Sequence, residues 1–256
     1  MTVGLLHPGE MGAAIGAALR ARGETVLWAS SGRSEATAAR AVEAGLEDAG
    51  DVGELCRRCD VLLSVCPPHA SLDAARSTAG FAGIYVDANA VSPATAREIA
   101  GLRARFVDGG IVGSPPRAPG TTRLYLSGVE AGQVAALFEG TPVDARVVSA
   151  EPGAASALKM AYAGWTKGSA ALLLAVRELA RAEGVEAELL AEWRQSLPEL
   201  EARLASAERS AATKGWRWIG EMEEIAASLA AHDLPDGFHR AAAEVYRRSS
   251  AEDPRR

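Results

Sequence analysis

The sequence predicts an α/β domain built on a parallel sheet, followed by a domain made only of helices. Three observations support this fold class. Short β-branched runs alternate with alanine-rich helical stretches over the first 150 residues. The first two runs are almost continuously apolar, as in strands that are buried on both faces. After residue 150 no convincing strand follows, and the pattern is helical to the end.

The expected strands are short runs rich in β-branched and other apolar residues, at 2–6, 25–29, 60–65, 84–88, 105–112, 122–128 and 145–149. Helices are expected between the early strands, at 10–22, 34–44, 51–58, 70–78 and 93–103. This β-α-β-α order requires parallel strands with helices on both faces of the sheet. We therefore assign residues 1–150 to a doubly wound α/β domain.

The second domain, residues 151–256, opens with a helix over about 153–183 that is apolar on nearly every side. Such a helix must be surrounded by other helices or by another subunit. Further helices are expected at 186–209, 213–231 and 236–249.

The composition argues against several classes of partner. A net charge of −6 disfavours nucleic acid and anionic membranes. No apolar run approaches the roughly 20 residues of a membrane span, and no secretory signal is recognisable, so a cytoplasmic protein is expected. Cys56, Cys59 and Cys66 lie in one segment without a second ligand pair, which favours buried thiols over a metal site.

The first strand leads through the turn "LLHPGEMG" into a helix, which is the context of a dinucleotide-binding loop. Gly9 and Gly12 have the spacing of the last two glycines of G-x-G-x-x-G, while His7 occupies the position of the first. Pro8 makes this turn rigid. The helix start would offer backbone amides to a phosphate. The candidate cofactor-binding residues of the turn are His7, Pro8, Gly9, Glu10 and Met11.

A strand–helix turn without a ligand has the same pattern, so the second strand provides a separate test. Ser30, Ser31, Arg33 and Ser34 follow it, whereas NAD-binding folds usually place Asp or Glu there. Hydroxyls beside an arginine suit the 2′-phosphate of NADP(H). Alternatively, Ser34 only caps the next helix, and both roles are compatible.

Several motifs together resemble the β-hydroxyacid dehydrogenase and 6-phosphogluconate dehydrogenase superfamily, in a subgroup with its own type of C-terminal helical domain. In chain order they are "GLLHPGEMG", "SSGRS", "SVCPPHAS", "DANAVSP", "DGGIVGSPP", "GAASALKMAY" and "KGWRWIGEMEEIA". The resemblance implies a Rossmann-type domain and a helical domain that forms a homodimer. It also implies hydride transfer between a nicotinamide and a small substrate.

The resemblance also suggests the residues of the active site. Lys159 follows Gly153 by six residues, as the catalytic lysine of the superfamily follows its glycine, and would donate or accept a proton. An ordinary solvated lysine is the alternative. Relatives place an asparagine one turn later, where this chain has Ala163. Lys167, near the same face of the helix, could assist instead.

Three loops complete the expected site. Asn89 stands where relatives often carry serine or threonine, and it could bind substrate or cofactor, or only satisfy a turn. Cys66, Pro67 and His69 would lie beside the nicotinamide, or His69 could only be exposed in its loop. Ser114 replaces a serine that relatives carry two positions earlier, so a carboxylate grip on the substrate is not assured.

Three functions remain open from the sequence. The first is an NADP(H)-dependent oxidoreductase that acts on a small hydroxy or oxo compound through Lys159. The second is an imine reductase on the same fold, which the missing asparagine favours and the retained lysine disfavours. The third is a protein that binds NADP without catalysis.

Overall fold

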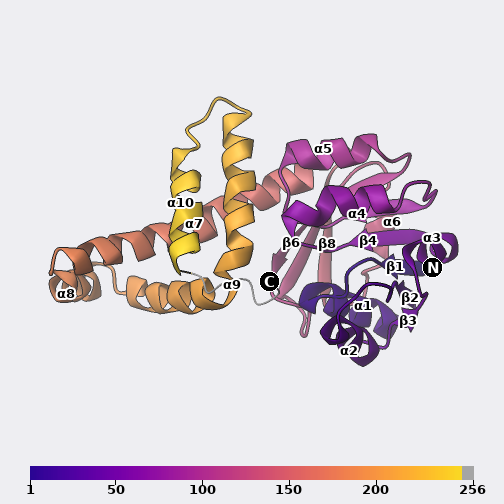
Figure 1. Cartoon of the computed structure of the whole chain (residues 1–256), viewed down its shortest axis with the longest axis horizontal. Helices are drawn as coiled ribbons and strands as arrows, with labels where there is room; N and C mark the ends of the chain where they lie inside the picture. The colour runs from indigo at the N-terminus through magenta and orange to yellow at the C-terminus, as the bar shows by residue number, and fades with distance from the viewer. Residues whose placement is uncertain (250–256) are drawn as a thin grey trace. The chain divides into compact units, whose positions relative to one another are not determined.

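The computed structural model describes residues 1–249, so the last seven residues of the predicted helical domain lie outside the described part of the chain. The chain divides into two compact units, Met1–Lys159 and the residues from Met160 onward. The first unit contains a sheet with helices on both faces, and the second contains only helices within residues 160–249 (Figure 1).

The first unit has one eight-stranded sheet in the order β3-β2-β1-β4-β5-β6-β7-β8. Its strands are β1 (Thr2–Leu5), β2 (Thr25–Trp28), β3 (Glu47–Asp48), β4 (Val61–Ser64), β5 (Ile84–Asp87), β6 (Phe106–Gly113), β7 (Thr122–Ser127) and β8 (Val143–Ser149). Strands β1 to β6 run parallel. Strand β7 runs antiparallel to β6 and parallel to β8. The sheet is therefore mixed rather than wholly parallel as expected, although seven of the strands are those that the sequence predicted.

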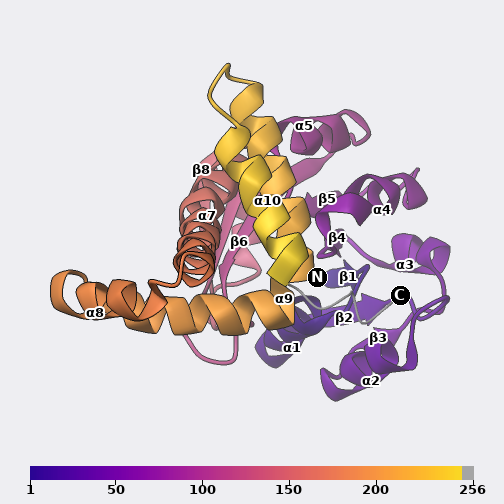
Figure 2. The ribbon, with the colours of Figure 1, turned by 60° about the vertical axis from the view of Figure 1, so that its left-hand side comes forward.

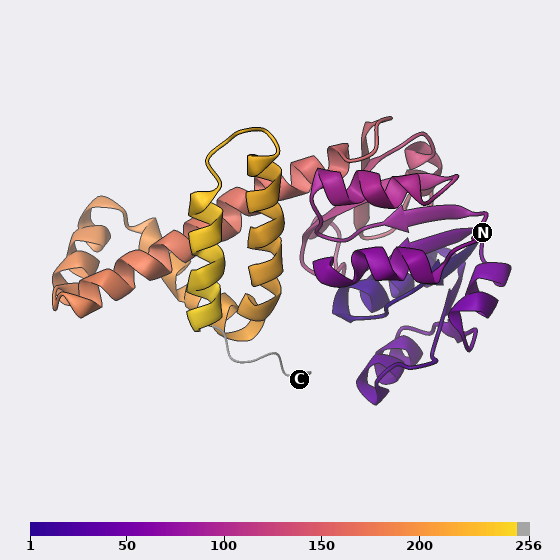
Figure 3. The same ribbon diagram turned by 45° about the horizontal axis from the view of Figure 1, so that its top comes forward.

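The helices of the first unit are α1 (Glu10–Arg22), α2 (Glu35–Glu43), α3 (Val52–Arg58), α4 (Ser71–Ser77), α5 (Pro93–Gly101), α6 (Ala131–Ala136) and the 3-10 turn η1 (Pro68–Ala70). Alternation along the strands divides the core between the two faces. Val61 and Leu63 pack with α1, α2 and α6, whereas Leu62 packs with α3, α4 and α5. Figure 3 shows α4 and α5 side by side on one face.

Two elements of this unit were not predicted. Strand β3 is only two residues long and both of its residues are exposed, so it carries no hydrophobic signal. Helix α6 has six residues, which is too short for a helical period to be recognised.

The helical unit consists of most of α7 (Ala154–Ala182) with α8 (Glu186–Ser196), α9 (Glu199–Ala230) and α10 (Gly237–Ser249). Helix α10 packs along the second half of α9, and α9 is bent (Figure 2). The prediction of separate helices at 186–209 and 213–231 was wrong. The helix is interrupted at Leu197 and Pro198, because proline disfavours helical backbone in the residue before it. Helix α9 begins after this break and continues without interruption. Among the helices within residues 1–249, none has both the length and the hydropathy that spanning a membrane requires.

Candidate active site

The carboxyl ends of parallel strands form the edge at which ligands bind in open α/β sheets. Here the strand order reverses between β1 and β4, because β1 is followed along the chain by β2 on one side and pairs with β4 on the other. Residues 6–9 leave β1 and residues 65–67 leave β4 at this edge. Both segments contain candidate cofactor-binding residues.

The turn after β1 is closed by a hydrogen bond from the Gly9 amide to the His7 carbonyl, at 2.9 Å. A Cβ on Gly12 would lie 2.5 Å from the same carbonyl oxygen, so only glycine fits there. At Gly9, in contrast, no described heavy atom beyond the glycine and its two chain neighbours lies within 4 Å of the position that a Cβ would take. Gly9 is also the N-cap of α1 and has no capping side chain. The first-turn amides, including those of Glu10 and Met11, therefore suit an anionic ligand.

The segment after β2 is folded back by contacts with Gly50. The Ser31 amide donates to the Gly50 carbonyl at 2.9 Å, and the Ser30 hydroxyl donates to it at 3.4 Å. The Ser34 hydroxyl caps α2 by accepting from the Thr37 amide at 3.3 Å. The capping role that the sequence suggested for Ser34 is thus confirmed, while a phosphate contact by these hydroxyls stays a prediction.

Two arginines accompany this segment. Burial lowers the pKa of the His7 imidazole to about 4, and the positive charge of Arg33 adds to the decrease. The Arg40 Nε of α2 donates a hydrogen bond to the carbonyl oxygen of the buried Pro8, at 3.4 Å. Arg40 was missed from the sequence because it lies inside the helix rather than in the loop. The sequence could have indicated Arg40 by its position, about one and a half helical turns after the N-cap Ser34, on a helix that begins at the expected phosphate site.

The residues present fit a phosphorylated dinucleotide. The Nδ1 atom of His7 and the Nε atom of Arg33 are buried, and neither has a hydrogen-bond partner among the described residues. Buried polar atoms are rarely left unsatisfied in proteins. Phosphate and ribose oxygens at this edge would provide partners, and the open space above Gly9 would leave room for a pyrophosphate.

A row of polar residues crosses the central strands where β4 and β5 end. Ser64 pairs with Asp87, and Asp87 pairs with Asp108, which in turn lies opposite Ser127 of β7. All four side chains are buried. Burial raises the pKa of the Asp87 carboxyl to about 7, and the charge of Asp108 adds to the increase.

Asn89 joins the loops that follow β4 and β5. Its Oδ1 accepts from the Cys66 amide at 2.5 Å, and its Nδ2 donates to Ser64 at 3.1 Å and to Asp87 at 2.9 Å. These bonds commit most of the hydrogen-bonding capacity of the amide. Asn89 thus fixes the shape of the Cys66 loop, and any direct contact with a ligand stays a prediction.

The other residues of the Cys66 loop differ in exposure. Burial raises the pKa of the Cys66 thiol to about 12, so the thiol is neutral and unreactive at ordinary pH. Pro67 is half-buried and His69 is exposed on η1. Cys56 is half-buried and Cys59 is buried, both are free thiols, and burial raises the pKa of the Cys59 thiol to about 12. No cluster that could hold a metal ion is found within residues 1–249.

The start of α7 is anchored on the polar row through Asp108. One carboxylate oxygen accepts from the amides of Gly153 at 3.0 Å and Ser156 at 2.9 Å, and from the Ser127 hydroxyl at 2.9 Å. The second oxygen accepts from the Ser156 hydroxyl at 2.5 Å. A carboxylate at a helix N-terminus is electrostatically favourable. Gly153 is required for the entry into α7, since its φ is +95°.

Lys159 lies on the second turn of α7, where the helix crosses β6. A Cβ on Gly110 would lie 2.8 Å from the Ala155 carbonyl oxygen and 3.0 Å from the Lys159 Cβ. Gly110 is two residues beyond Asp108, and Asp108 pairs with the last residue of β5. The Cβ of the half-buried Lys159 therefore lies near the carboxyl edge of the sheet. The glycines of "DGGIVG" belong to strand β6 rather than to a loop, and they leave the space that α7 needs to pack against this strand.

Ser114 and Lys167 are placed differently. Ser114 is exposed just after β6, and its carbonyl accepts from the Thr122 hydroxyl. Lys167 belongs to the helical unit, where its ammonium pairs with Glu221 and lies 5.3 Å from the ring centre of Trp218. The catalytic role suggested for Lys167 stays a prediction. Ala163, where relatives carry an asparagine, is buried.

Asp87 and Asp108, like Arg40, are site residues that the sequence reasoning missed. The available signal was an aspartate directly after each of two short apolar runs, "IYV" and "FV". Burying a carboxylate at the end of a strand costs free energy unless the carboxylate is hydrogen-bonded or paired there.

The fold and this edge define a dinucleotide-binding α/β protein with a helix-borne lysine. Comparison with known proteins gives the family. Residues 180–249 match a domain described as a domain of unknown function, DUF1932. An uncharacterised 28.5 kDa protein of Methanothermus fervidus is 32% identical over 194 residues, which cover 74% of this chain and 75% of that protein.

Solved structures extend the match over nearly the whole chain. A conserved protein of unknown function, reported to resemble 3-hydroxyacid dehydrogenases, is 30% identical with a TM-score of 0.74, over 97% of this chain and 96% of its own. The 3-hydroxyisobutyrate dehydrogenase of Mycobacterium tuberculosis shares the fold at 17% identity, with a TM-score of 0.73 over 96% and 92% of the chains. A reductive aminase of Aspergillus terreus, solved with NADPH, does so at 21% identity, with a TM-score of 0.59 over 96% and 92%. The chain belongs to the β-hydroxyacid dehydrogenase and 6-phosphogluconate dehydrogenase superfamily.

Proposed function

We propose that this protein is an NADP(H)-dependent oxidoreductase that transfers a hydride to or from a small hydroxy or oxo compound. Lys159 serves as the proton donor or acceptor. The observation that carries the proposal is the placement of α7. Asp108 fixes the start of the helix, and Gly110 lets the Cβ of Lys159 approach the carboxyl edge of the sheet.

The cofactor, when bound, supplies or accepts the hydride. The amides after Gly9 would hold its pyrophosphate, with His7 and Pro8 shaping the turn. Arg33 and Arg40, with the hydroxyls of Ser30, Ser31 and Ser34, would hold the 2′-phosphate. Charged donors suit this group, because hydrogen bonds between ionised partners are about twice as strong as neutral ones.

The remaining residues have supporting tasks. Lys159 donates a proton to the substrate oxygen as that oxygen gains charge, or takes the proton in the reverse direction. Asn89 keeps the Cys66 loop in place, with Pro67 and His69 bordering the nicotinamide. Ser114 is a candidate for contact with the substrate.

The test replaces the lysine with an uncharged side chain of similar length. Lys159→Met should lower kcat by roughly 10²–10⁴-fold, the usual contribution of a positioned acid or base. Titration calorimetry should give an NADPH dissociation constant within about threefold of the wild type. Lys214→Met, at an exposed position of α9, is the matched control. An unchanged kcat in Lys159→Met would refute the role of the lysine.

Cofactor preference gives a second prediction. Arg33→Ala should weaken NADP⁺ binding by roughly 10–100-fold, which corresponds to one charge-assisted hydrogen bond. Its effect on NAD⁺ should be below about threefold. Arg57→Ala, which removes an exposed arginine paired with Glu54 on α3, is the control. Equal losses for both dinucleotides would contradict a 2′-phosphate site.

Reduction of an imine is the second candidate function. The buried Ala163 favours it, because this helix offers no amide at the position where hydroxyacid relatives carry asparagine. Panels of oxo acids, ketones and cyclic imines with NADPH distinguish the two reactions. Binding of NADPH without turnover on any panel would support a non-catalytic role. We also propose that the protein is a homodimer formed through its helical unit.

A further inference from the structure

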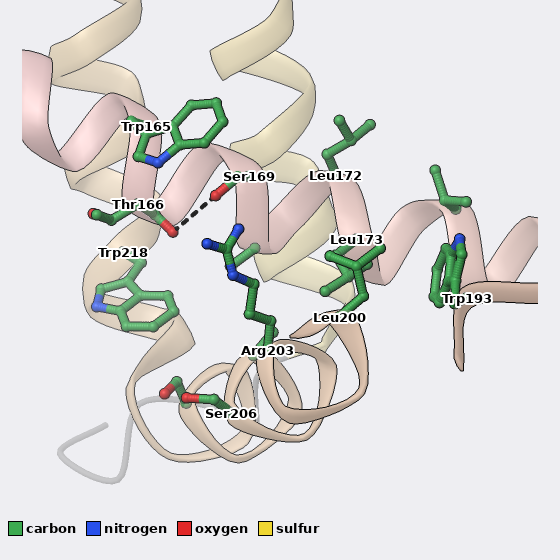
Figure 4. Close-up of a pocket in the computed structure, with 14 residues that line it drawn as sticks. Trp165, Thr166, Ser169, Leu172, Leu173, Trp193, Leu200, Arg203, Ser206 and Trp218 are labelled. Carbon is green, nitrogen blue, oxygen red and sulfur yellow. Dashed lines mark hydrogen bonds between the residues drawn. The ribbon is translucent and has the colours of Figure 1, made fainter. Parts of the chain in front are cut away.

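The helical unit contains a groove that the proposed reaction does not use. All the described residues that line it lie between 165 and 218, so it is formed within this unit. Helices α7 and α9 provide its two walls, and α8 adds Trp193 (Figure 4). Its volume of about 580 Å³ lies within the roughly 300–1,000 Å³ that is usual for small-molecule sites.

Indole rings provide much of the apolar lining of the groove. Trp165, Trp193 and Trp218 all line it, which is three of the five tryptophans of the chain. Trp165 is 69% exposed, although burial of an indole is strongly favourable. Figure 4 shows Trp165 and Trp218 toward one end of the groove and Trp193 toward the other. Their flat apolar faces suit an aromatic ligand.

Trp218 is held in place by residues that do not line the groove. The Lys167 ammonium lies 5.3 Å from the centre of its ring. The buried Tyr246 of α10 packs edge-on against it, with ring centres 5.1 Å apart. The Tyr246 hydroxyl in turn donates to the Lys167 carbonyl at 2.6 Å. This part of the wall is thus formed before a ligand arrives, which lowers the cost of ordering it on binding.

Arg203 is the one charged side chain among the described residues that line the groove. Glu199 precedes it by four residues, a spacing at which glutamate and arginine pair on helix surfaces. Arg203 nevertheless makes no hydrogen bond or ion pair with any residue of 1–249, whereas Arg177 of α7 pairs with Glu186. Figure 4 shows Arg203 reaching across the groove toward Ser169. Its guanidinium is therefore available to an anion.

Hydroxyl groups surround this arginine. Ser206 and Ser210 follow Arg203 by three and seven residues, which places them on the same side of α9. Within residues 1–249 neither of these two hydroxyls has a hydrogen-bond partner. From the opposite wall, Ser169 makes only a long bond of 3.4 Å to the Thr166 carbonyl. A carboxylate accepts hydrogen bonds through both oxygens, so a guanidinium with neighbouring hydroxyls matches it.

We propose that the groove binds an aromatic monocarboxylate, with its carboxylate on Arg203 and its ring against Trp165 and Trp218. A second carboxylate would enter an apolar groove without a cation to pair with it, which is costly. The volume accommodates a ligand of about two fused rings. This binding goes beyond the proposed hydride transfer and requires neither the dinucleotide nor Lys159.

Titration calorimetry of the full-length protein with 2-naphthoate tests the proposal. The wild type should bind about one molecule per chain, with a dissociation constant on the order of 0.1 mM for a ligand of this size. Arg203→Met keeps an unbranched side chain and removes the charge, so it should weaken binding by roughly 10–100-fold. The uncharged 2-naphthamide should bind both proteins equally to within about threefold. Arg209→Met, at an exposed position of α9 outside the groove, is the matched control and should bind 2-naphthoate like the wild type.

A second measurement locates the ligand without changing Arg203. Ser206→Cys places a thiol at an exposed position of the groove. At ten times the dissociation constant, 2-naphthoate should slow its reaction with a maleimide by about tenfold, the factor expected for a site that is occupied most of the time. Ser196→Cys, exposed on α8 outside the groove, should react at an unchanged rate. Trp165→Ala should weaken both 2-naphthoate and 2-naphthamide by roughly fivefold or more, since both ligands lose the ring contact.

Several results would overturn the inference. These are no binding of 2-naphthoate, equal affinity in Arg203→Met, or displacement of 2-naphthoate by NADPH, which would move the ligand to the dinucleotide site. Octanoate that binds as tightly as 2-naphthoate would refute the aromatic assignment. Lys159→Met should bind 2-naphthoate like the wild type. The groove and the proposed reaction therefore stand or fall on separate measurements, one of binding and one of turnover.

Discussion

Asp108 gives the sharpest quantitative prediction, because its carboxylate connects the sheet to the helix that carries Lys159. The substitution Asp108→Asn keeps the size of the side chain and removes its charge. One oxygen remains to accept from Gly153, Ser156 and Ser127, at the 2.9–3.0 Å observed for the carboxylate. The new amide nitrogen faces the Ser156 hydroxyl, which can rotate and accept.

The expected loss follows from those bonds. A hydrogen bond to a charged group contributes about 1.5–3 kcal/mol and a neutral one about 0.5–1.5 kcal/mol, so each of the three bonds weakens by about 1 kcal/mol. Relief of the repulsion between Asp108 and Asp87 offsets part of this loss. We therefore expect Asp108→Asn to lower the free energy of unfolding by about 2–3 kcal/mol. Asp108→Ala leaves four donors unsatisfied and should be more destabilising.

Urea unfolding at pH 7.5 measures this difference, with Asp144→Asn as the control. Asp144 is part of an exposed pair with Arg146, whose loss should cost less than about 1 kcal/mol. In the folded enzyme, Asp108→Asn should lower kcat by about 10–100-fold, since small displacements of a catalytic group are costly. The affinity for NADPH should change by less than about threefold. Stability equal to that of Asp144→Asn, or a parallel loss of kcat and NADPH affinity, would refute the anchoring argument.

Two further predictions concern buried groups at the same edge. The folded-state pKa of Asp87, about 7, lies above the ordinary 3.8, so its contribution to stability is complete below pH 4 and is lost as pH rises through 7. Asp87→Asn should flatten this decline in thermal unfolding between pH 5 and pH 8, and an unchanged slope would exclude Asp87 as its source. Gly12→Ala should lower the melting temperature, because its Cβ would meet the His7 carbonyl, whereas Gly9→Ala should keep the melting temperature and weaken NADPH binding. The reverse result would contradict the assignment of the open space to the cofactor.

The strands, helices and superfamily were predictable because their signals are local. Buried strands show as continuous apolar runs, and the glycine spacing at Gly9 and Gly12 marks the turn. The break near Pro198 was visible as well, but the choice of where the next helix ended was not. Helix α9 continues where a boundary was expected because its buried residues, including Ala211 and Gly215, face neighbouring helices. Such tertiary support leaves no mark in a local pattern.

The partners of individual side chains were much harder to predict. Asn89 could be singled out from its motif, yet its bonds to Cys66, Ser64 and Asp87 depend on how two loops meet. The interaction of Arg40 with Pro8 joins residues that are 32 positions apart. Lys167 resembled Lys159 in the sequence, because both lie in one apolar helix. The ion-pair partner of Lys167, Glu221, is 54 residues away and leaves no local mark in that helix.

The polar row explains why the catalytic proposal is specific to one of three lysines. A lysine becomes a useful acid or base only where its helix is fixed against the reacting edge, since proton transfer depends on placement. The polar row lies in register across four strands, with Ser64, Asp87, Asp108 and Ser127 as its members. Within it, Asp108 accepts hydrogen bonds from the start of α7 and so fixes where that helix begins. Gly110 then removes the side chain that would hold the helix away from β6. Neither feature involves Lys167 or Lys214, so under the proposed function we expect Lys159→Met to lower turnover more than Lys167→Met or Lys214→Met.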